Sequence, residues 1–246
     1  MKFDVVTIFP EMLDSVIDFG ITGQACDRGL MSIQGWNPRA FTTDVHRVVD
    51  DRPYGGGPGM VMKPEPLAKC LDAVMGKRGE GAGPVIYLSP QGQRFNQAKA
   101  RELASLSQMT LLCGRYEGVD ERVLSSRVDE EISIGDYVLA GGELAAMVMI
   151  ETVARLLPGV LGNEQSAEQD SFSGELLDCP HFTRPEVFES MPVPKVLLSG
   201  DHGRIRQWRH EAALKRTKSR RPDLLGEQDS CEPNEGVNDV KGSEVR

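Results

Sequence analysis

Five glycines between Leu111 and Leu157 are the residues best suited to form a ligand site. They fall where predicted apolar strands give way to loops, at Gly114, Gly118, Gly135, Gly141 and Gly142. Glycine allows positive φ angles and lets a ligand approach the backbone closely. Open α/β sheets bind their ligands at such strand ends. The spacing therefore favours a binding crevice, although the same glycines are also compatible with simple tight turns.

Several ionisable side chains lie at the end of this stretch and beyond it. Asp170 lies in a polar segment, where a carboxylate is usually solvated or caps a helix. Arg155 lies near the end of a predicted helix, where a cation complements the helix dipole. Asp178 precedes Cys179 and a proline, where an aspartate commonly forms an Asx turn. Cys179 and His181 are metal-ligating types, but two ligands without further spacing favour a packed thiol.

The segments that hold these residues alternate between short apolar runs and helix-forming runs. The apolar runs predict strands, at residues 3–9, 85–89, 109–114 and 131–135. The helix-forming runs fall at residues 11–18, 21–30, 64–75, 97–106 and 143–157, with a further run within 115–124. This alternation predicts an α/β protein with a largely parallel sheet and helices on both faces.

Three predicted strands end in segments that should converge on one crevice. These segments are residues 88–92, 113–118 and 134–137. In the first of them, Pro90-Gln91-Gly92 is expected to end the strand. Residues 32–41 are expected to be irregular or to form an edge strand.

A glycine-rich segment lies between the first helices and this crevice. Residues 53–59 contain four glycines and two prolines, which excludes a regular helix or a central strand. The segment matches neither the dinucleotide fingerprint nor the phosphate-binding P-loop. It is either a floppy connector or a preorganised ligand surface.

Length and composition indicate an ordinary soluble globular protein. The 246 residues are 39% hydrophobic and 26% charged, enough for one large domain or two smaller ones. The five cysteines are scattered without a C-x-x-C pair, which favours reduced thiols and a cytoplasmic location. The N-terminus lacks the pattern of a signal peptide. The most apolar segment, residues 137–160, carries Glu143, Glu151 and Arg155 and is not expected to cross a membrane.

Charge is distributed unevenly along the chain. The net charge of −9 argues against a nucleic-acid partner, but residues 202–222 hold eight Lys or Arg against one acid. The helix predicted there, at 203–219, offers either a phosphate-contacting patch or a solvated basic face without a partner. The polar residues 161–172 have the composition of an interdomain linker. Residues from 225 onward are acidic, lack apolar periodicity and are predicted to be disordered.

Five longer strings resemble one known family. They are VDDRPYGGGPGM at 49–60, IYLSPQG at 86–92, CGRYEGVDERV at 113–123, SIGDYVLAGGELAAM at 133–147 and LLDCPHFTRPEVF at 176–188. In this order they resemble the bacterial tRNA (guanine-N1)-methyltransferases of the TrmD type, in the SPOUT class. The resemblance covers residues 1–223 and leaves out the acidic tail. Ala145 stands where the family pattern has proline, a change that removes no functional group.

The resemblance implies a fold that periodicity cannot show. Residues 1–160 would form the methyltransferase domain, with a deep trefoil knot in the C-terminal part of its sheet, an exceptional topology. Residues 161–173 would be a flexible linker, 174–223 a small, mostly helical tRNA-binding domain, and 224–246 an acidic, disordered tail. The family also implies a homodimer whose active site is shared between the subunits.

The resemblance further implies S-adenosylmethionine as the methyl donor, held in the knot by the three strand-end loops. Its contacts, carried over by position, would be Tyr87, Leu88, Ser89, Pro90, Gly114, Tyr116, Glu117, Gly118, Ile134, Gly135, Asp136, Tyr137, Val138, Leu139, Gly141 and Gly142. Mg²⁺ is also implied, although the sequence shows no ligand cage for it.

For the reaction, the resemblance implies methyl transfer to N1 of the tRNA guanine immediately 3′ of the anticodon (position 37). Guanine N1 carries a proton near neutral pH and needs a general base before it can attack. Asp170 matches the family position of that base. Arg155 matches the position of a cation that stabilises negative charge developing on O6. Asp178 would hold the guanine or support Asp170.

Two other functions are compatible with the residues themselves. A non-catalytic RNA-binding protein would use the basic helix and keep a vestigial pocket. A small-molecule enzyme on a doubly wound sheet would use another nucleotide, and the absent fingerprints count against it. Under the resemblance, the loop 50–59 lines the dimer interface, and tRNA phosphates contact the basic residues Lys215, Arg216, Lys218, Arg220 and Arg221.

Overall fold

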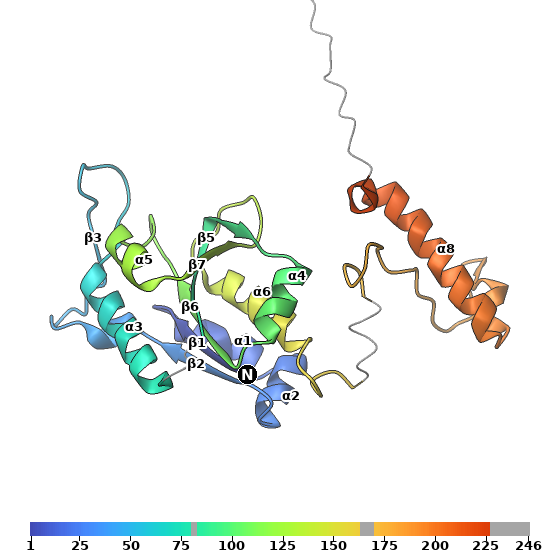
Figure 1. The fold of residues 1–246 in the computed structure, drawn as a ribbon, viewed down its shortest axis with the longest axis horizontal. Coiled ribbons are helices and arrows are strands. Elements are labelled where there is room, and N and C mark those ends of the chain that lie inside the picture. Colours follow the sequence, from blue (N-terminus) through green and yellow to red (C-terminus); the bar gives the residue numbers. More distant parts are fainter. Residues whose placement is uncertain (80–82, 163–169, 227–246) are drawn as a thin grey trace, which may run out of the picture. The chain divides into compact units, whose positions relative to one another are not determined.

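The computed structural model describes residues 1–79, 83–162 and 170–226. The chain divides into two compact units, Met1–Glu168 and Gln169–Arg246 (Figure 1). Most of the predicted linker, residues 163–169, and most of the predicted disordered tail, residues 227–246, lie outside the described residues. The flexibility predicted for them therefore stays a prediction.

The first unit is built on a five-stranded sheet in the order β2-β1-β6-β5-β7. The strands are β1 Lys2–Val6, β2 Ser32–Trp36, β5 Val85–Arg94, β6 Gln108–Cys113 and β7 Glu130–Ser133. Each neighbouring pair runs parallel, which confirms the predicted α/β class. Residues 32–41 were expected to be irregular or to form an edge strand. They contain the edge strand β2, and the short helix η2, Pro38–Phe41, follows it.

Helices cover both faces of the sheet, as the strand–helix alternation predicts (Figure 1). One face carries η1 Pro10–Leu13, α1 Asp14–Ile17, α2 Gly20–Asp27, α4 Gln97–Ala104 and α6 Glu143–Ala154. The other face carries α3 Pro64–Arg78 and α5 Glu121–Arg127. The helix expected at 11–18 is thus a 3-10 turn followed by a single α-helical turn.

The two helical layers enclose separate hydrophobic cores because successive residues of a strand point to opposite faces. In β6, Met109 and Leu111 pack in one core, whereas Leu112 packs in the other. In β5, Ile86 and Tyr87 divide in the same way. A strand buried on both faces reads as a continuous apolar run, which is how the sequence presents both strands.

The end of β5 differs from the sequence prediction. The strand continues past Pro90 to Arg94 and pairs with β7 twice, since Leu88 and Gln93 both face Ile132. Residues 89–92 bulge out between these two pairings. Proline has no N–H to donate, so it is tolerated at such a bulge and does not end the strand.

The glycine-rich segment is a loop between two short antiparallel strands, β3 Asp50–Asp51 and β4 Val61–Met62. It extends away from the sheet in Figure 1. Its base is fixed by two backbone hydrogen bonds: Glu117 N donates to the Met60 carbonyl (2.9 Å) and Met62 N donates to the Gly118 carbonyl (2.9 Å). The loop is therefore tied to the segment that follows β6.

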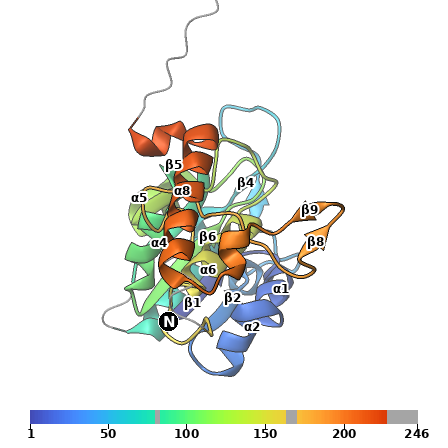
Figure 2. The ribbon, with the colours of Figure 1, turned by 90° about the vertical axis from the view of Figure 1, so that its right-hand side faces the viewer.

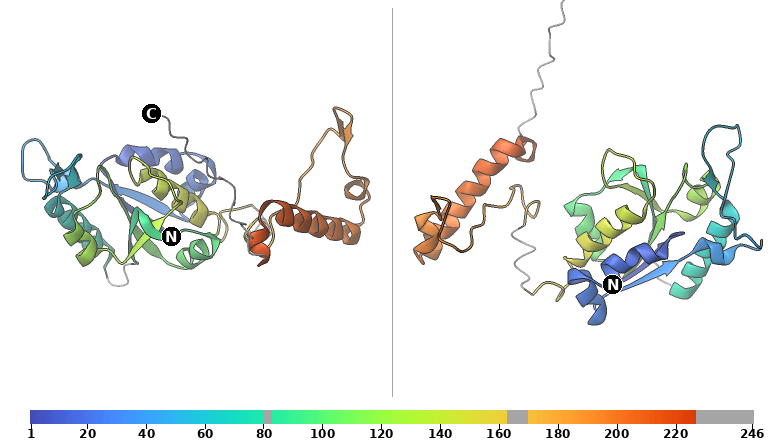
Figure 3. Two further views of the ribbon diagram at one scale, coloured as in Figure 1. Left: turned by 90° about the horizontal axis from the view of Figure 1, so that it is seen from above. Right: turned by 180° about the vertical axis from the view of Figure 1, so that it is seen from behind.

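The second unit is organised around one long helix, α8 His202–Arg220, close to the predicted 203–219. Asp201 caps it, because its carboxylate accepts hydrogen bonds from the Gly203 and Arg204 N–H groups. The other elements of its described residues are β8 Val187–Phe188, β9 Met191–Pro192, η3 Lys195–Leu198 and η4 Pro222–Leu225. Figures 2 and 3 show the β8–β9 hairpin on a loop that extends away from α8.

The segment 177–182 is held against α8 by side chains of that helix. Thr217 Oγ1 accepts a hydrogen bond from Leu177 N (2.9 Å), and Arg216 donates to the Asp178 carbonyl (3.0 Å). Thr217 itself is fully buried. These contacts fix the backbone that carries Asp178 and the residues after it.

Candidate functional site

A cavity of about 360 Å³ lies at the carboxyl ends of β5, β6 and β7. Residues 87–91, 114–119, 132–135 and 137–142 contribute most of its wall. The three strand-end segments expected to converge therefore do so. Small-molecule pockets usually have volumes of roughly 300–1,000 Å³, so this cavity has room for a ligand of moderate size.

The cavity is lined by fifteen of the sixteen residues predicted to hold the cofactor. The exception is Asp136, which lies outside the lining. Its exposed carboxylate pairs with Arg94 instead (2.9 Å). The positions matched to the donor site therefore lie almost all in the wall of one cavity, and their role in holding the donor stays a prediction.

Two glycines in the wall are required by close packing. A Cβ on Gly142 would lie 2.8 Å from the Cys113 Cα, a backbone atom that cannot move aside cheaply. A Cβ on Gly114 would lie 2.7 Å from the Tyr87 hydroxyl. The segments after β6 and β7 can meet because Gly142 lacks a side chain, and Gly114 leaves space for the Tyr87 ring of β5.

A buried ion pair joins the two segments beside these glycines. Arg115 Nε donates to both carboxylate oxygens of Glu143, at 3.2 and 3.0 Å. The Thr7 hydroxyl donates to the same carboxylate (2.7 Å), and the Glu143 side chain is only 1% exposed. The Arg115 guanidinium also lies over the Phe9 ring, 4.7 Å from its centroid. A carboxylate can remain buried here because each oxygen has a charged or hydroxyl donor.

The ion pair also packs against Gly141. A Cβ on this glycine would lie 2.2 Å from Arg115 Nε and 2.6 Å from Glu143 Oε2. Sequence reasoning did not identify Arg115 and Glu143 as partners. Both lie in the strings that carry the family resemblance, but their separation of 28 positions hides the contact.

Tyr116 links the cavity wall to the glycine-rich loop. Its φ of +62° lies in the left-handed region, which a tyrosine seldom adopts. Its side chain interacts with Asp50 of β3 and with Arg39. Burial and then the Asp50 carboxylate raise the pKa of the Tyr116 phenol, while Arg39 acts in the opposite direction. These neighbours fix a strained residue at the rim of the cavity.

Further lining residues were not among the predicted contacts. They are Gln91, Arg115, Val119, Glu121, Leu124, Ile132, Ser133, Ala140 and Ala145. Most of them adjoin predicted positions in the chain, so extending each strand-end segment by one or two residues would have found them. Ala145, where the family pattern has proline, is a buried residue in the first turn of α6.

The three predicted catalytic residues are divided between the units. Arg155 belongs to the first unit, where it is exposed and forms the C-cap of α6. Asp170 and Asp178 belong to the second unit and are both half-buried. The Asp170 carbonyl accepts a hydrogen bond from Ser173 N (3.1 Å). Within the second unit, the two aspartates share the short segment that precedes the basic helix.

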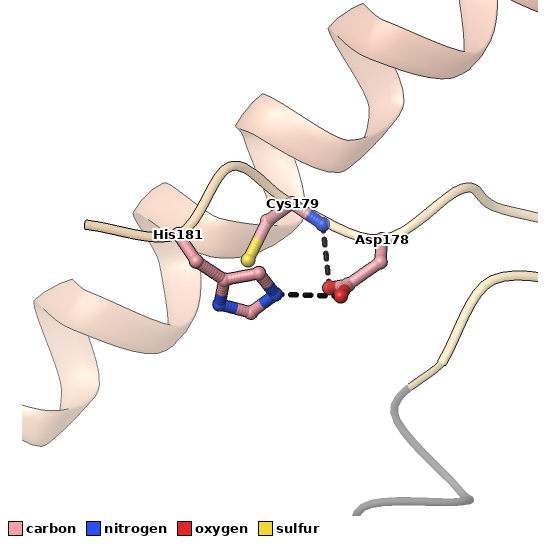
Figure 4. A group of neighbouring side chains, drawn as sticks. All are labelled: Asp178, Cys179 and His181. Atoms are coloured by element: carbon pink, nitrogen blue, oxygen red, sulfur yellow. Dashed lines mark hydrogen bonds and ion pairs between the residues drawn. The ribbon is translucent and has the colours of Figure 1, made fainter. Parts of the chain in front are cut away.

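The Asp178 carboxylate is fully engaged by its own neighbours (Figure 4). Oδ1 accepts a hydrogen bond from Cys179 N (2.6 Å), and Oδ2 lies 2.6 Å from His181 Nε2. Burial raises the pKa of Asp178, but the hydrogen bonds from His181 and Cys179 outweigh it and leave the pKa below its usual value. An Asp178 carboxylate with these partners is held in its ionised form.

The basic residues of α8 differ in how free they are to contact a partner. Arg216 is half-buried and bonds to the Asp178 carbonyl, and Arg221 pairs with Asp223 (2.6 Å). Lys215, Lys218 and Arg220 are exposed. Arg221, which follows the last residue of α8, is exposed too, although it pairs with Asp223.

One group of side chains within the described ranges could hold a metal ion, namely Asp178, Cys179 and His181. Mg²⁺ prefers oxygen ligands and retains several waters. A thiol and an imidazole do not suit it. The Mg²⁺ implied by the family resemblance therefore does not fit this group.

The cysteines that the structure describes form no disulfide. Cys26, Cys70, Cys113 and Cys179 are free. Burial raises the pKa of the Cys70 thiol to about 12. Across the same part of the chain, no helix combines the length and apolar character needed to cross a membrane.

Comparisons with known proteins place this geometry in a family. The sequence model of the tRNA (Guanine-1)-methyltransferase TrmD family matches residues 1–227. A tRNA (guanine-N(1)-)-methyltransferase of Pectobacterium atrosepticum is 59% identical over 225 residues, covering 92% of this chain and 89% of that relative. A relative with the same name from Serratia proteamaculans is also 59% identical, over 92% of this chain and 88% of its own length.

The parallel sheet with a cavity at its strand ends, together with these matches, defines the protein as a methyltransferase. The family match spans all the described residues of both units. The chain belongs to the tRNA (Guanine-1)-methyltransferase family TrmD, which confirms the resemblance of its five strings.

The Arg115–Glu143 pair generates a prediction about stability. Replacing Glu143 by Gln removes the charge that pairs with Arg115, so we expect the free energy of unfolding to fall by roughly 1.5–3 kcal/mol, the usual contribution of hydrogen bonds to charged groups. Denaturant titration of the wild type and of Glu143→Gln measures the difference in the free energy of unfolding. Glu151→Gln, an exposed position on the same helix, is the control and should stay within about 0.5 kcal/mol of wild type. Equal losses in the two variants would contradict a special role for this pair.

Proposed function

We propose that the protein transfers a methyl group from S-adenosylmethionine to N1 of the tRNA guanine immediately 3′ of the anticodon, position 37. The observation that carries this proposal is the cavity at the ends of β5, β6 and β7, which gathers almost all of the positions matched to the donor site. Family membership supports the reaction class. A cytoplasmic location, where tRNA is abundant, belongs to the same proposal.

The chemistry of the cavity wall fits S-adenosylmethionine, which supplies an electrophilic methyl group on a sulfonium. Its amino-acid portion carries an ammonium and a carboxylate. Glu117 and Glu121 line the cavity and offer carboxylates to the ammonium, whereas the charge of Arg115 is paired with Glu143. The glycines of the wall leave backbone N–H and C=O groups accessible to the rest of the molecule. The charged side chains thus suit the amino-acid portion of this ligand, and the accessible backbone groups suit the rest of it.

The proposal includes a trefoil knot in the segment 111–157. Gly142 N donates to the Gly114 carbonyl (3.0 Å), and Arg115 forms a β-bridge with Gly141. The segments after β6 and β7 therefore meet backbone to backbone, without room for a Cβ at Gly142. Such tight contact between two strand-end loops supports the knotted arrangement of the SPOUT class.

In the proposed reaction, Asp170 accepts the proton of guanine N1, and Arg155 stabilises the negative charge that develops on O6. Asp178 is a poorer candidate for the base, because both its oxygens already accept hydrogen bonds and its pKa lies below the usual value. We therefore assign Asp178 the role of positioning the guanine or supporting Asp170.

A homodimer completes the proposed active site. Leu144 and Val148 lie on α6, whose opposite side packs in the core, yet they are 50% and 46% exposed. Exposed apolar side chains on a core helix are typical of a surface that a second subunit covers. In this arrangement, the cavity of one subunit would work with Asp170 of the other, and Lys215, Lys218 and Arg220 would contact tRNA phosphates.

The cavity yields a prediction about donor binding. In Gly142→Ala, the new methyl group would lie 2.8 Å from the Cys113 backbone. The cavity wall must then shift, and we expect the affinity for S-adenosylmethionine to fall by roughly tenfold or more, since displacements near 1 Å can disrupt a site that strongly. Isothermal titration calorimetry measures the affinity of each variant for S-adenosylmethionine. The control is Gly76→Ala, where a Cβ meets nothing within 4 Å. Unchanged affinity in Gly142→Ala would argue against this location of the donor.

The assignment of the base yields a second prediction. Asp170→Asn keeps the shape of the side chain but removes its basicity, so the rate of methyl transfer should fall about 10²–10⁴-fold. The affinity for S-adenosylmethionine, measured by titration, should stay unchanged. Glu175→Gln, which alters an exposed carboxylate of the same unit, should retain the wild-type rate. Full activity of Asp170→Asn would show that another group accepts the proton.

The substrate itself is tested with tRNA transcripts that differ only at the guanine 3′ of the anticodon. We expect labelled methyl to enter the transcript with guanine and not those with another base at this position. A non-catalytic RNA-binding protein would bind every transcript and methylate none. Transfer that does not depend on this base would refute the proposed substrate.

A further inference from the structure

We propose that Asp178, Cys179 and His181 form a binding site for a transition-metal dication such as Zn²⁺ in the second unit. The ligand atoms of the three side chains all lie within 4.8 Å of one another (Figure 4). Ligand atoms bound to one zinc ion at about 2.0–2.3 Å are separated by somewhat less than this. A small contraction of the group would therefore complete three bonds to one ion.

The identity of the ligands selects the metal. Thiolate and imidazole are the preferred ligands of zinc and its neighbours in the first transition series, whereas Mg²⁺ and Ca²⁺ prefer oxygen. A Cys, a His and an Asp give three protein ligands, the number typical of a zinc site that keeps one position for water. The His181 side chain is 72% exposed, so an ion and its bound water can reach the site from solvent.

The backbone under this group is held in place before any ion arrives. Ser171 Oγ accepts a hydrogen bond from Asp178 N (2.9 Å), and Arg216 donates to the Asp178 carbonyl (3.0 Å). Outer contacts of this kind orient metal ligands and strengthen binding. An ion would take the place of the hydrogen bond between His181 Nε2 and the Asp178 carboxylate (2.6 Å), with the imidazole neutral and its proton on Nδ1. It would also release the thiol proton of Cys179 to the buffer.

The test is a titration of the full-length protein with Zn²⁺ against a colorimetric chelator, and with Co²⁺ as a spectroscopic probe. We expect one metal ion per chain, and a thiolate-to-cobalt charge-transfer band in the near ultraviolet. His181→Asn and Cys179→Ser should each weaken Zn²⁺ binding by roughly tenfold or more, at least the loss caused by removing an outer-shell partner. Cys179→Ser should also abolish the cobalt band.

Two cysteine controls identify the source of the signal. Cys26→Ser alters a half-buried thiol of the first unit, and Cys231→Ser alters the cysteine of the acidic tail. Both variants should bind metal as the wild type does. Absence of binding, a band that disappears with Cys231→Ser, or unchanged affinity in His181→Asn would each overturn the proposal. Because His181 is exposed, its variant stays informative even if Cys179→Ser folds poorly. Metal binding is measured without methyl transfer, so either proposal can fail without the other.

Discussion

The close approach of residues 113–115 to residues 141–143 is the constraint on which the cavity depends. One backbone hydrogen bond, from Gly142 N to the Gly114 carbonyl, joins the two segments directly. Glycine at position 142 leaves the required space. The buried Glu143 carboxylate then fastens the junction, since it binds Arg115 on one segment and Thr7 beyond the end of β1. Three parallel strands are thus tied together at the edge where the cavity opens.

The sequence predicted most of what arises from local patterns. Continuous apolar runs identified β5 and β6, because strands buried on both faces leave no alternation to interpret. The prediction that Pro90 ends β5 was wrong, because the chain resumes pairing with β7 after a bulge. That outcome depends on a strand 40 residues further along, which local turn signals cannot report. The pairing of the exposed Asp136 side chain with Arg94 is another contact between distant residues that local patterns do not report.

In the site, too, sequence motifs located single residues but not the contacts between residues far apart in the chain. Matched strings located the lining residues, since backbone position along a motif largely determines which residues face the cavity. The Arg115–Glu143 pair and the contact of Tyr116 with Asp50 were missed because each joins residues far apart in the chain. In the second unit, Cys179 is a buried free thiol, as the sequence favoured, and the contact of Asp178 with His181 beside it could not be seen from the spacing alone.

The glycines of the cavity have a consequence for inhibition. A compound that binds the bare backbone of such a wall gains little from side chains that mutation can exchange. At Gly142 any substitution adds a Cβ against the Cys113 backbone, so the same change that repels the compound also disturbs the wall itself. Drug resistance through single substitutions should therefore arise more readily at the rim, where Tyr137 and Val138 are exposed, than in the depth of the cavity.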